Sequence, residues 1–148
     1  MADGSFNGIV CTQTLYLVFD LGRAIGEFNR VLKKDGRVLL TSPFVSPATN
    51  EPGHFWNVNQ FALRKLYEDH GFKILVLKPT CAVRETIVNL KHRFPIDNLQ
   101  LYNHWYRRLF SYWFIIETKL ARYRDLRDGQ TLVQSRFAVD FIVVAEKL

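Results

Sequence analysis

Residues 27–44 read EFNRVLKKDGRVLLTSPF, which is the end of an expected helix followed by a turn and a strand. The helix begins upstream, where apolar side chains recur at helical spacing. They are Leu21, Ala24, Ile25, Phe28, Val31 and Leu32. Asp20 is placed to cap this helix, and Gly36 is placed to end it. Arg37–Thr41 (RVLLT) is then expected to form a strand that Pro43 terminates.

A second strand is expected just before this helix. Phe6–Thr12 reads FNGIVCT, a short apolar run with β-branched residues that is typical of a buried parallel strand. A strand, a helix and a strand joined this closely form a right-handed βαβ unit, whose ligand edge lies at the carboxyl ends of the strands. The sequence therefore predicts an α/β fold with its functional site at that edge.

The next segments continue the α/β pattern. Ser42–Val58 is rich in Pro, Asn, Ser and aromatic residues, which favours a structured loop above the same edge. Asn59 is placed to cap a helix that Gly71 ends. Phe72–Leu77 is expected to be the third strand.

The last third of the chain is expected to be mostly helical. An irregular stretch holding Cys81 and Pro95 precedes one long helix from about Asn98 to Arg124. We expect this helix to be a lid or core element whose aromatic stripe packs on the sheet. The stripe consists of Tyr102, Tyr106, Leu109, Trp113, Ile116, Leu120 and Tyr123, widened by Phe110 and Phe114. Asp128-Gly129 marks a turn before the last strand, Phe137–Ala145.

Composition limits the classes of protein to consider. The chain has 148 residues, of which 48% are apolar, so it can bury a core. It has two distant cysteines and no apolar stretch near the roughly 18 residues of a spanning helix. We therefore expect a cytoplasmic, reduced protein. His92 and His104 lack partners at metal-ligand spacing, so no metal site is expected.

Positive charge is concentrated in the C-terminal half. Between Arg84 and Arg136 there are ten Lys or Arg against five Asp or Glu, which accounts for +5 of the formal net charge of +6. Such a segment can meet phosphates, nucleic acid or an anionic membrane, or it can simply be a solvated helix face. The charge pattern alone leaves both interpretations open.

Several motifs occur in a fixed order in the first half of the chain. They are SFNGIVCTQTLYLVFD at 5–20, EFNRVLKKDG at 27–36, RVLLTSPF at 37–44, HFWNVN at 54–59 and HGF at 70–72. This order resembles the second half of the type 11 family of class I S-adenosylmethionine-dependent methyltransferases. In that family FDxVxCxxxLEHVxD precedes ExxRVLKPGG and a strand such as xLLLSTPF, and a DYWRFT-like segment and AGF follow.

The resemblance implies a truncated Rossmann-like methyltransferase fold. It is α/β in class, with a four-stranded mixed sheet in the family order 4-5-7-6, flanking helices and one long inserted helix. Residues 1–148 are then a single partial methyltransferase domain, of which about 81–135 form an inserted, mostly helical segment. Phe6–Thr12 corresponds to the fourth strand of seven. Because the first three strands are absent, we expect it to be an exposed edge that invites pairing with another chain.

S-adenosyl-L-methionine is the cofactor that the resemblance implies. In the family, backbone amides of a GxGxG loop approach its methionine part, which only glycine permits. The eight glycines of this chain include no GxG pair, and the acidic residue that holds the ribose in the family has no counterpart. What remains is the floor of the cofactor site, which we expect at Cys11, Thr12, Gln13 and Leu17.

The acceptor pocket is expected beside this floor. By resemblance Tyr16, Phe55 and Trp56 bind the acceptor, and His54 is the candidate catalytic base. A simpler interpretation stays open, in which Phe55 and Trp56 anchor the loop and His54 is solvated. The LEH motif of the family is Leu15-Tyr16-Leu17 here, so its histidine is absent. Methyl transfer does not depend on that residue, because orienting the nucleophile suffices when no proton must be removed.

The function predicted first is methyl transfer to a small-molecule acceptor, by a C-terminal portion that is not expected to be competent alone. One alternative is a degenerate, non-catalytic binding or interaction module, and another is a basic surface binder acting through the helix at 98–124. The expected partners are the acceptor, a second copy or a complementing N-terminal half at the Phe6–Thr12 edge, and an anionic membrane at the basic helix. Nucleic acid is disfavoured as a partner.

Overall fold

The computed structural model describes residues 1–48, 52–98, 104–129 and 138–148. Contacts between residues divide the chain into two compact units. The first unit comprises Met1–Pro79 and Asp140–Leu148, and the second comprises Thr80–Val139. The inserted segment expected at about 81–135 lies within the second unit.

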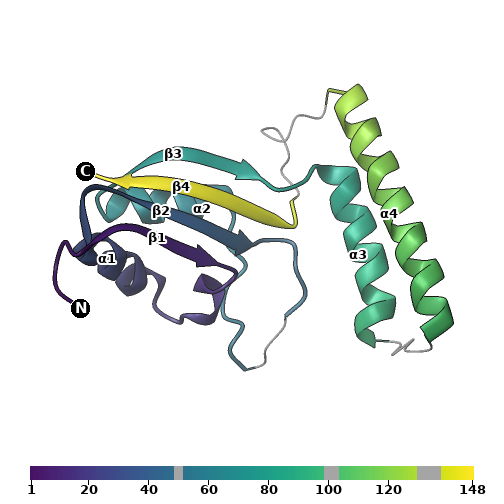
Figure 1. The fold of residues 1–148 in the computed structure, drawn as a ribbon, viewed down its shortest axis with the longest axis horizontal. Helices are drawn as coiled ribbons and strands as arrows, with labels where there is room; N and C mark the ends of the chain where they lie inside the picture. Colours follow the sequence, from purple (N-terminus) through teal and green to yellow (C-terminus); the bar gives the residue numbers. More distant parts are fainter. Residues whose placement is uncertain (49–51, 99–103, 130–137) are drawn as a thin grey trace. The chain divides into compact units, whose positions relative to one another are not determined.

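The first unit contains a four-stranded mixed sheet (Figure 1). Its strands are β1 (Phe6–Thr12), β2 (Leu32–Pro43), β3 (Phe72–Pro79) and β4 (Asp140–Lys147), in the order β1-β2-β4-β3. β1 pairs with β2 in parallel, whereas β4 runs antiparallel to both β2 and β3. The predicted α/β fold with a mixed four-stranded sheet is thus confirmed. When β1 to β4 take the family numbers four to seven, the observed order reads 4-5-7-6.

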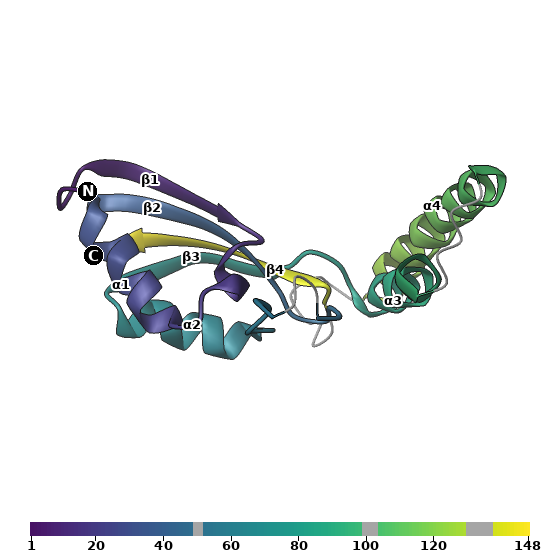
Figure 2. The ribbon, with the colours of Figure 1, turned by 90° about the horizontal axis from the view of Figure 1, so that it is seen from below.

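Two helices cover one face of the sheet, as Figure 2 shows. They are α1 (Leu21–Val31) and α2 (Gln60–Asp69). The core between helices and sheet consists of fully buried side chains: Ile25, Leu63 and Tyr67 from the helices, and Val38, Leu40, Phe72, Val143 and Ala145 from the strands. The alternation of strand residues explains the arrangement, because Leu39, between two buried neighbours, is partly exposed on the other face.

Local sequence signals explain where these helices begin. Asp20 Oδ1 accepts a hydrogen bond from the Arg23 backbone N–H at 2.9 Å. Asn59 Oδ1 accepts from the backbone N–H groups of Phe61 and Ala62. Both predicted N-caps are therefore confirmed. Gly71, with φ of +77°, ends α2 as predicted, in a conformation that glycine adopts readily.

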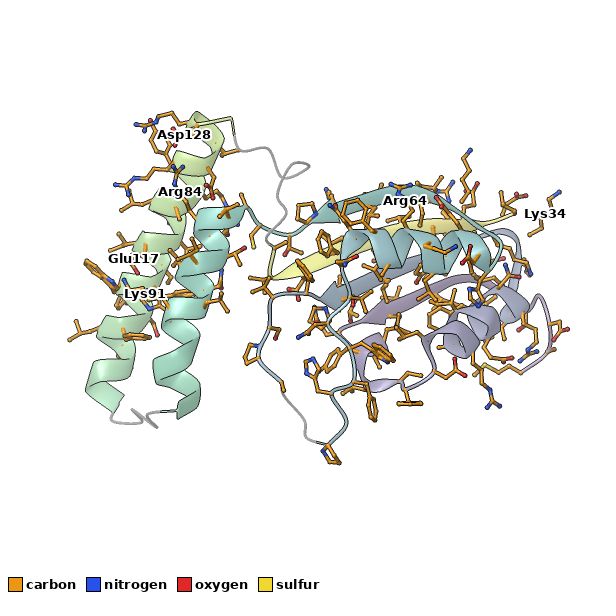
Figure 3. All side chains as sticks on the ribbon, turned by 180° about the vertical axis from the view of Figure 1, so that it is seen from behind. Lys34, Arg64, Arg84, Lys91, Glu117 and Asp128 are labelled. Atoms are coloured by element: carbon orange, nitrogen blue, oxygen red, sulfur yellow. The ribbon has the colours of Figure 1, made fainter. Side chains whose placement is uncertain are left out.

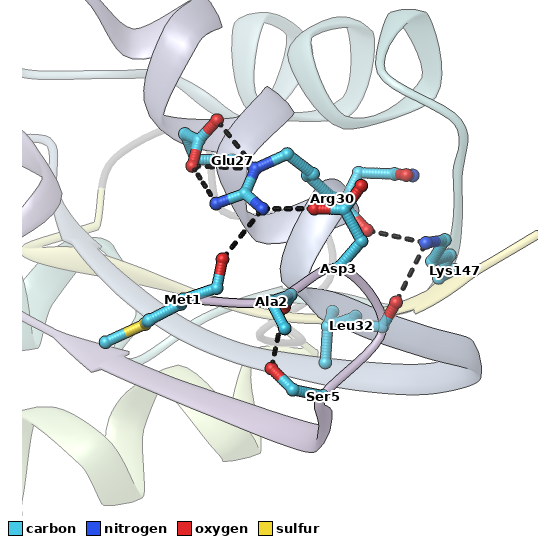
Figure 4. Close-up of polar contacts among 9 residues, drawn as sticks. Met1, Ala2, Asp3, Ser5, Glu27, Arg30, Leu32 and Lys147 are labelled. Carbon is cyan, nitrogen blue, oxygen red and sulfur yellow. Dashed lines mark hydrogen bonds and ion pairs between the residues drawn. The ribbon is translucent and has the colours of Figure 1, made fainter.

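The predicted end of the first helix was wrong. α1 ends at Val31, five residues before Gly36, and Leu32 is already extended and paired with Phe6. The ammonium group of Lys147, at the end of β4, donates to the carbonyl oxygens of Asn29 and Leu32 at 2.6 and 2.8 Å (Figure 4). This contact from the far end of the chain stabilises the last carbonyls of α1.

Gly36 instead permits a close approach of chain segments. A Cβ atom there would lie 2.8 Å from the backbone oxygen of Lys33 and 3.3 Å from that of Asn7. β2 therefore begins before the turn residues of the KKDG motif and continues through them. Asp35, with φ of +61°, provides the left-handed backbone that the turn requires.

The boundaries of β3 and β4 differ slightly from the predictions. β3 runs two residues further than expected, to Pro79. β4 begins at Asp140 and ends at Lys147, whereas the strand was predicted at 137–145. Phe137 itself lies outside the described residues.

The second unit is a pair of helices, α3 (Val83–Asn98) and α4 (His104–Arg127). α3 occupies the stretch around Pro95 that was predicted to be irregular, so that prediction was wrong. Asp125 explains the difference, because its carboxylate, from α4, accepts from the backbone N–H groups of Arg84 and Glu85 at the start of α3. This cap comes from α4 rather than from a residue next to α3, so no local sequence motif predicts it. The turn at Asp128-Gly129 is confirmed.

Ion pairs join the two helices of the second unit. Figure 3 shows Arg84 with Asp128, at 2.7 Å, and Lys91 with Glu117, at 2.7 Å. Glu117 also contacts Nε2 of His92, whose side chain is buried between the rings of Phe110 and Phe114. A further pair joins Arg122 and Glu85 at 2.6 Å.

Within the second unit, the aromatic stripe of α4 does not face α3. Leu109, Trp113, Ile116, Leu120 and Tyr123 are all at least half exposed. The stripe residue Tyr102 and the side chain of Tyr106 lie outside the described part. The α4 side chains that pack toward α3 are more polar, and they include Glu117 and Asp125. Helical period predicted the spacing correctly, but it did not predict which face is buried.

We predict that Gly36→Ala lowers the free energy of unfolding by about 1–3 kcal/mol, because backbone must shift to admit the Cβ atom. Gly22→Ala is the matched control, since a Cβ there finds ordinary contacts of 3.5 Å or more at the start of a helix. It should leave stability unchanged or raise it by up to about 1 kcal/mol. Denaturant unfolding measures both, and equal effects would contradict this role of Gly36.

We predict that the second unit loses stability as the pH falls. Hydrogen bonds from Lys91 and His92 hold the pKa of Glu117 below its ordinary value. The stabilising contribution of a carboxylate with a lowered pKa is complete above the unfolded-state pKa and is lost as the pH falls through the folded-state value. Thermal unfolding at a series of acidic pH values measures this loss.

Glu117→Gln should flatten this pH dependence, because the titrating group is gone. Glu68→Gln, which alters an exposed pair with Arg64 on α2, is the control and should keep the original slope. Equal pH slopes for the wild type and Glu117→Gln would contradict the prediction.

Candidate functional site

The candidate site lies at the carboxyl end of β1, where the first strand meets its parallel neighbour. Thr12 is aligned with Thr41 of β2, and Gln13 follows immediately. Gln13 has φ of +49°, a left-handed conformation that is uncommon for a residue other than glycine. Such backbone strain persists only where surrounding contacts enforce it, and it is frequent at functional sites.

Three contacts hold Gln13 in this conformation. Its backbone N–H donates to both the carbonyl oxygen and Oγ1 of Thr41, each at 3.1 Å. Its side-chain Nε2 donates to Oδ1 of Asp140, the first residue of β4, at 3.0 Å. One residue thus links the ends of β1, β2 and β4. It defines a polar rim at the edge that the sequence predicted for the cofactor.

The other predicted cofactor residues lie next to Gln13. Cys11 is partly buried and Thr12 is exposed. Burial raises the pKa of the Cys11 thiol, and a hydrogen bond from the Leu15 backbone opposes that shift only in part. Leu17 ends the short 3-10 helix η1 (Leu15–Leu17), whose first two residues are buried. Leu17 itself lies at the surface and is 36% exposed.

The four residues predicted on the acceptor side come together as a second group, the aromatic loop cluster: Tyr16, His54, Phe55 and Trp56. The rings of Tyr16 and His54 have centroids 4.6 Å apart. The backbone N–H of Phe55 donates to the carbonyl oxygen of Tyr16 at 3.0 Å. The structure therefore places the loop that follows β2 against η1, as expected for a loop above the sheet edge.

Phe55 and Trp56 also anchor this loop. Trp56 Nε1 donates to the carbonyl oxygens of Val18 and Phe19, each at 3.1 Å. Phe55 packs edge-on against Phe19 at 5.4 Å. Both side chains nevertheless stay about two-fifths exposed. The anchoring interpretation and the acceptor-binding interpretation are therefore compatible, because each ring is fixed on one side and open on another.

A polar contact orients His54. Its Nε2 lies 3.0 Å from Oδ1 of Asn57, and Asn57 Nδ2 donates to the carbonyl oxygen of Ser46 at 3.0 Å. Since the Asn57 amide nitrogen is the donor to Ser46, its oxygen is the acceptor for His54. Nε2 of His54 is therefore the donor in this hydrogen bond.

The sequence alone did not identify the residues that hold these side chains in place. Thr41 and Asp140 fix Gln13, and Asn57 orients His54. A lone acidic residue beginning an apolar strand was an available signal for Asp140. Ser42, next to Thr41, is fully buried, and its hydroxyl makes no hydrogen bond within the described residues. Among those residues no group of three or more His, Cys, Asp or Glu could hold a metal ion.

The mixed sheet, the helices on its face and the site edge together define the C-terminal portion of a Rossmann-like methyltransferase fold. The family model described as a methyltransferase domain matches residues 1–40. This match covers the expected fourth strand, the helix and the start of the next strand. The resemblance of this chain to the methyltransferases is thereby confirmed.

Solved structures extend the likeness over nearly the whole chain. The [4+2]-cyclase SpnF is 18% identical with a TM-score of 0.58, over 99% of this chain and 52% of its own. Phosphoethanolamine N-methyltransferase 2 of Haemonchus contortus, in complex with S-adenosyl-L-methionine, is 16% identical with a TM-score of 0.54, over 98% and 34%. An S-adenosylmethionine-dependent methyltransferase of Mesorhizobium loti is 11% identical with a TM-score of 0.52, over 98% and 64%.

At these identities the likeness establishes a shared fold. The chain spans about half the length of the first of these proteins. None of the curated proteins matches the sequence significantly.

We predict that Cys11 reacts slowly with alkylating reagents, because burial raises the pKa of its thiol and the thiolate is the reactive species. At neutral pH its labelling by iodoacetamide, followed by mass spectrometry, should be slower than that of an exposed model cysteine. Thr14→Cys provides that reference within the same chain, at an exposed position three residues away. Faster labelling of Cys11 than of the introduced cysteine would restore a nucleophilic interpretation of this residue.

Proposed function

We propose that this chain is the C-terminal portion of an S-adenosylmethionine-dependent methyltransferase and forms the floor of its cofactor site. The observation that carries the proposal is the strained Gln13, held at the end of β1 by Thr41 and Asp140. Ligands of open α/β sheets bind beyond the carboxyl ends of the strands, which is where these three residues meet.

The residues present fit part of a cofactor site. Cys11, Thr12 and Gln13 would lie beside the methionine and sulfonium end, and Leu17 would provide an apolar contact. The buried Ser42 hydroxyl adjoins the same strand end. When bound, S-adenosyl-L-methionine supplies an electrophilic methyl group. The sequence has no GxG pair to let a backbone approach the methionine part, so these residues form one wall of the site.

The aromatic loop cluster is the proposed binding surface for a small-molecule acceptor. Tyr16, Phe55 and Trp56 present partly fixed rings, which suit a flat or apolar acceptor. Where the acceptor is a hydroxyl or an amine, His54 is the proposed general base. Where no proton must be removed, the cluster acts only by orienting the acceptor.

A degenerate, non-catalytic binding module is the second candidate. The likeness to the [4+2]-cyclase SpnF keeps this candidate open, since a protein with this fold is named for a reaction other than methyl transfer. Function resides in sites rather than in folds. The two candidates differ in whether cofactor affinity can be restored.

The edge of β1 is the proposed contact for a second copy of the chain or for a complementing N-terminal half. β1 is an end strand of the sheet, and its Val10 side chain is 72% exposed. An apolar edge strand offers unpaired backbone groups to another strand.

A cytoplasmic location is consistent with the absence of a disulfide at either cysteine, Cys11 or Cys81. The second unit carries a separate candidate role, peripheral membrane contact through α4.

We predict that the chain alone binds S-adenosylhomocysteine only weakly, with a Kd of about 1 mM or above, because it provides one wall of the site. Isothermal titration calorimetry measures this. Adding a fragment that carries the first three strands and the glycine-rich loop of a class I methyltransferase should bring the Kd to the micromolar range. Gln13→Ala should weaken that restored binding, whereas Lys73→Ala, an exposed position on β3, should not.

Two outcomes would overturn parts of the proposal. Micromolar binding by the chain alone would show that the floor is sufficient for cofactor binding. No binding in the mixture, with the sheet intact by circular dichroism, would support the non-catalytic module instead.

A further inference from the structure

The second unit has an inverted distribution of polarity. Charged side chains lie between its two helices, where apolar side chains are usual. Glu85, His92 and Asp125 are at most 6% exposed, and each contacts a charged group or a backbone donor on the other helix. Ion pairs and a helix cap thus lie between α3 and α4.

Phe110 and Phe114 of α4 pack on His92, whereas the other large apolar side chains described on α4 are exposed. The exposed apolar residues Leu109, Tyr112, Trp113, Ile116, Leu120 and Tyr123 each lie three or four residues from another member, so they form one stripe along the helix. Their side chains are between 50% and 67% exposed. We call this stripe the outer face of α4. Contiguous exposed apolar surface of this kind marks a surface that contacts another apolar phase or molecule.

Cations flank the outer face. Arg108, Lys119 and Arg124 are exposed on the same helix, and within the described part of the chain none of them makes an ion pair. The acidic partners are already engaged: Glu85 with Arg122, Glu117 with Lys91 and His92, and Asp128 with Arg84 and Arg127. The surface beside the stripe is therefore positive without neighbouring acidic compensation.

We propose that the outer face of α4 is a docking surface for an anionic lipid bilayer. This role does not depend on methyl transfer. Trp, Tyr, Leu and Ile on one face, with Lys and Arg beside them, is the composition that places a helix in the plane of a membrane interface. The rings suit the headgroup level, and the long cationic side chains can reach lipid phosphates while their stems stay in the apolar layer.

The helix is suited to lie on a membrane rather than to cross it. None of the helices in the described residues is long and apolar enough to span a bilayer. The 24 residues of α4 extend over about 36 Å, so the stripe can contact lipid along most of that length. Glu117 and Asp125, on the α3 side, are kept away from the lipid by their partners.

Charge complementarity favours an anionic bilayer over nucleic acid or a second copy of the chain as the molecule that covers this face. Nucleic acid binding requires many phosphate contacts and polar readout, whereas the centre of this face is apolar. A second copy would place the same cations opposite each other, which like-charge repulsion disfavours. An anionic bilayer offers an apolar layer for the stripe and anionic headgroups for the cations beside it.

The test is sedimentation of the full chain with vesicles of phosphatidylcholine alone or with phosphatidylserine added. We expect binding to the anionic vesicles that weakens as salt is raised. Lys119→Ala with Arg124→Ala should reduce the partition coefficient roughly 25-fold, since each cation near an anionic surface contributes about fivefold. Trp113→Ala should reduce it about tenfold. Lys33→Ala with Lys34→Ala removes the same charge from exposed positions in the first unit and should change it little.

Three results would overturn the proposal. The first is no binding to anionic vesicles. The second is binding that Trp113→Ala leaves unchanged. The third is a concentration-dependent dimer, measured without lipid, that Trp113→Ala dissociates, since a second copy would then cover the face. Circular dichroism of each variant confirms that the helices are retained, so loss of binding is not loss of folding.

Discussion

The first unit depends on the backbone pairing of β2, which bonds to β1 on one side and to β4 on the other. Val38 and Leu40 of this strand are fully buried and lie opposite Ala145 and Val143 of β4. The alternate positions point to the other face. Because side chains alternate along a strand, the register of β2 decides which residues the helices cover. The same register aligns Thr41 with Thr12 and so creates the contact that holds Gln13.

The ends of this pairing have different roles. At one end, Lys147 and the turn at Gly36 join the C-terminus of α1 to the sheet, through contacts that concern stability. At the other, Thr41 and Asp140 hold Gln13 in a strained conformation that a purely structural turn could avoid by using glycine. The chemistry proposed for this fold lies at the strained end. A βαβ unit thus separates the part that maintains the fold from the part that can bind a ligand.

The second unit follows a different physical logic. Buried ion pairs contribute little net stability relative to apolar packing, because both charges lose their hydration. They do specify which face of each helix is inside. In the α3–α4 pair this leaves the aromatic stripe for another surface. The helical period of the stripe was visible in the sequence, yet the same period suits a buried face and an outward one. Only the positions of Glu117 and Asp125 against α3 distinguish them.

The sequence by itself determined the α/β class, the succession of strands and the caps at Asp20 and Asn59. These features follow from the period of the apolar residues and from side chains that form hydrogen bonds with backbone groups two or three residues away. Both signals are local in the sequence. It did not determine the end of α1, the existence of α3 or the conformation of Gln13. Tertiary structure decided those features, because each depends on a partner distant in the chain: Lys147 for α1, Asp125 for α3 and Asp140 for Gln13. The spacing of residues along the sequence does not reveal such partners, because they come together only in the folded chain.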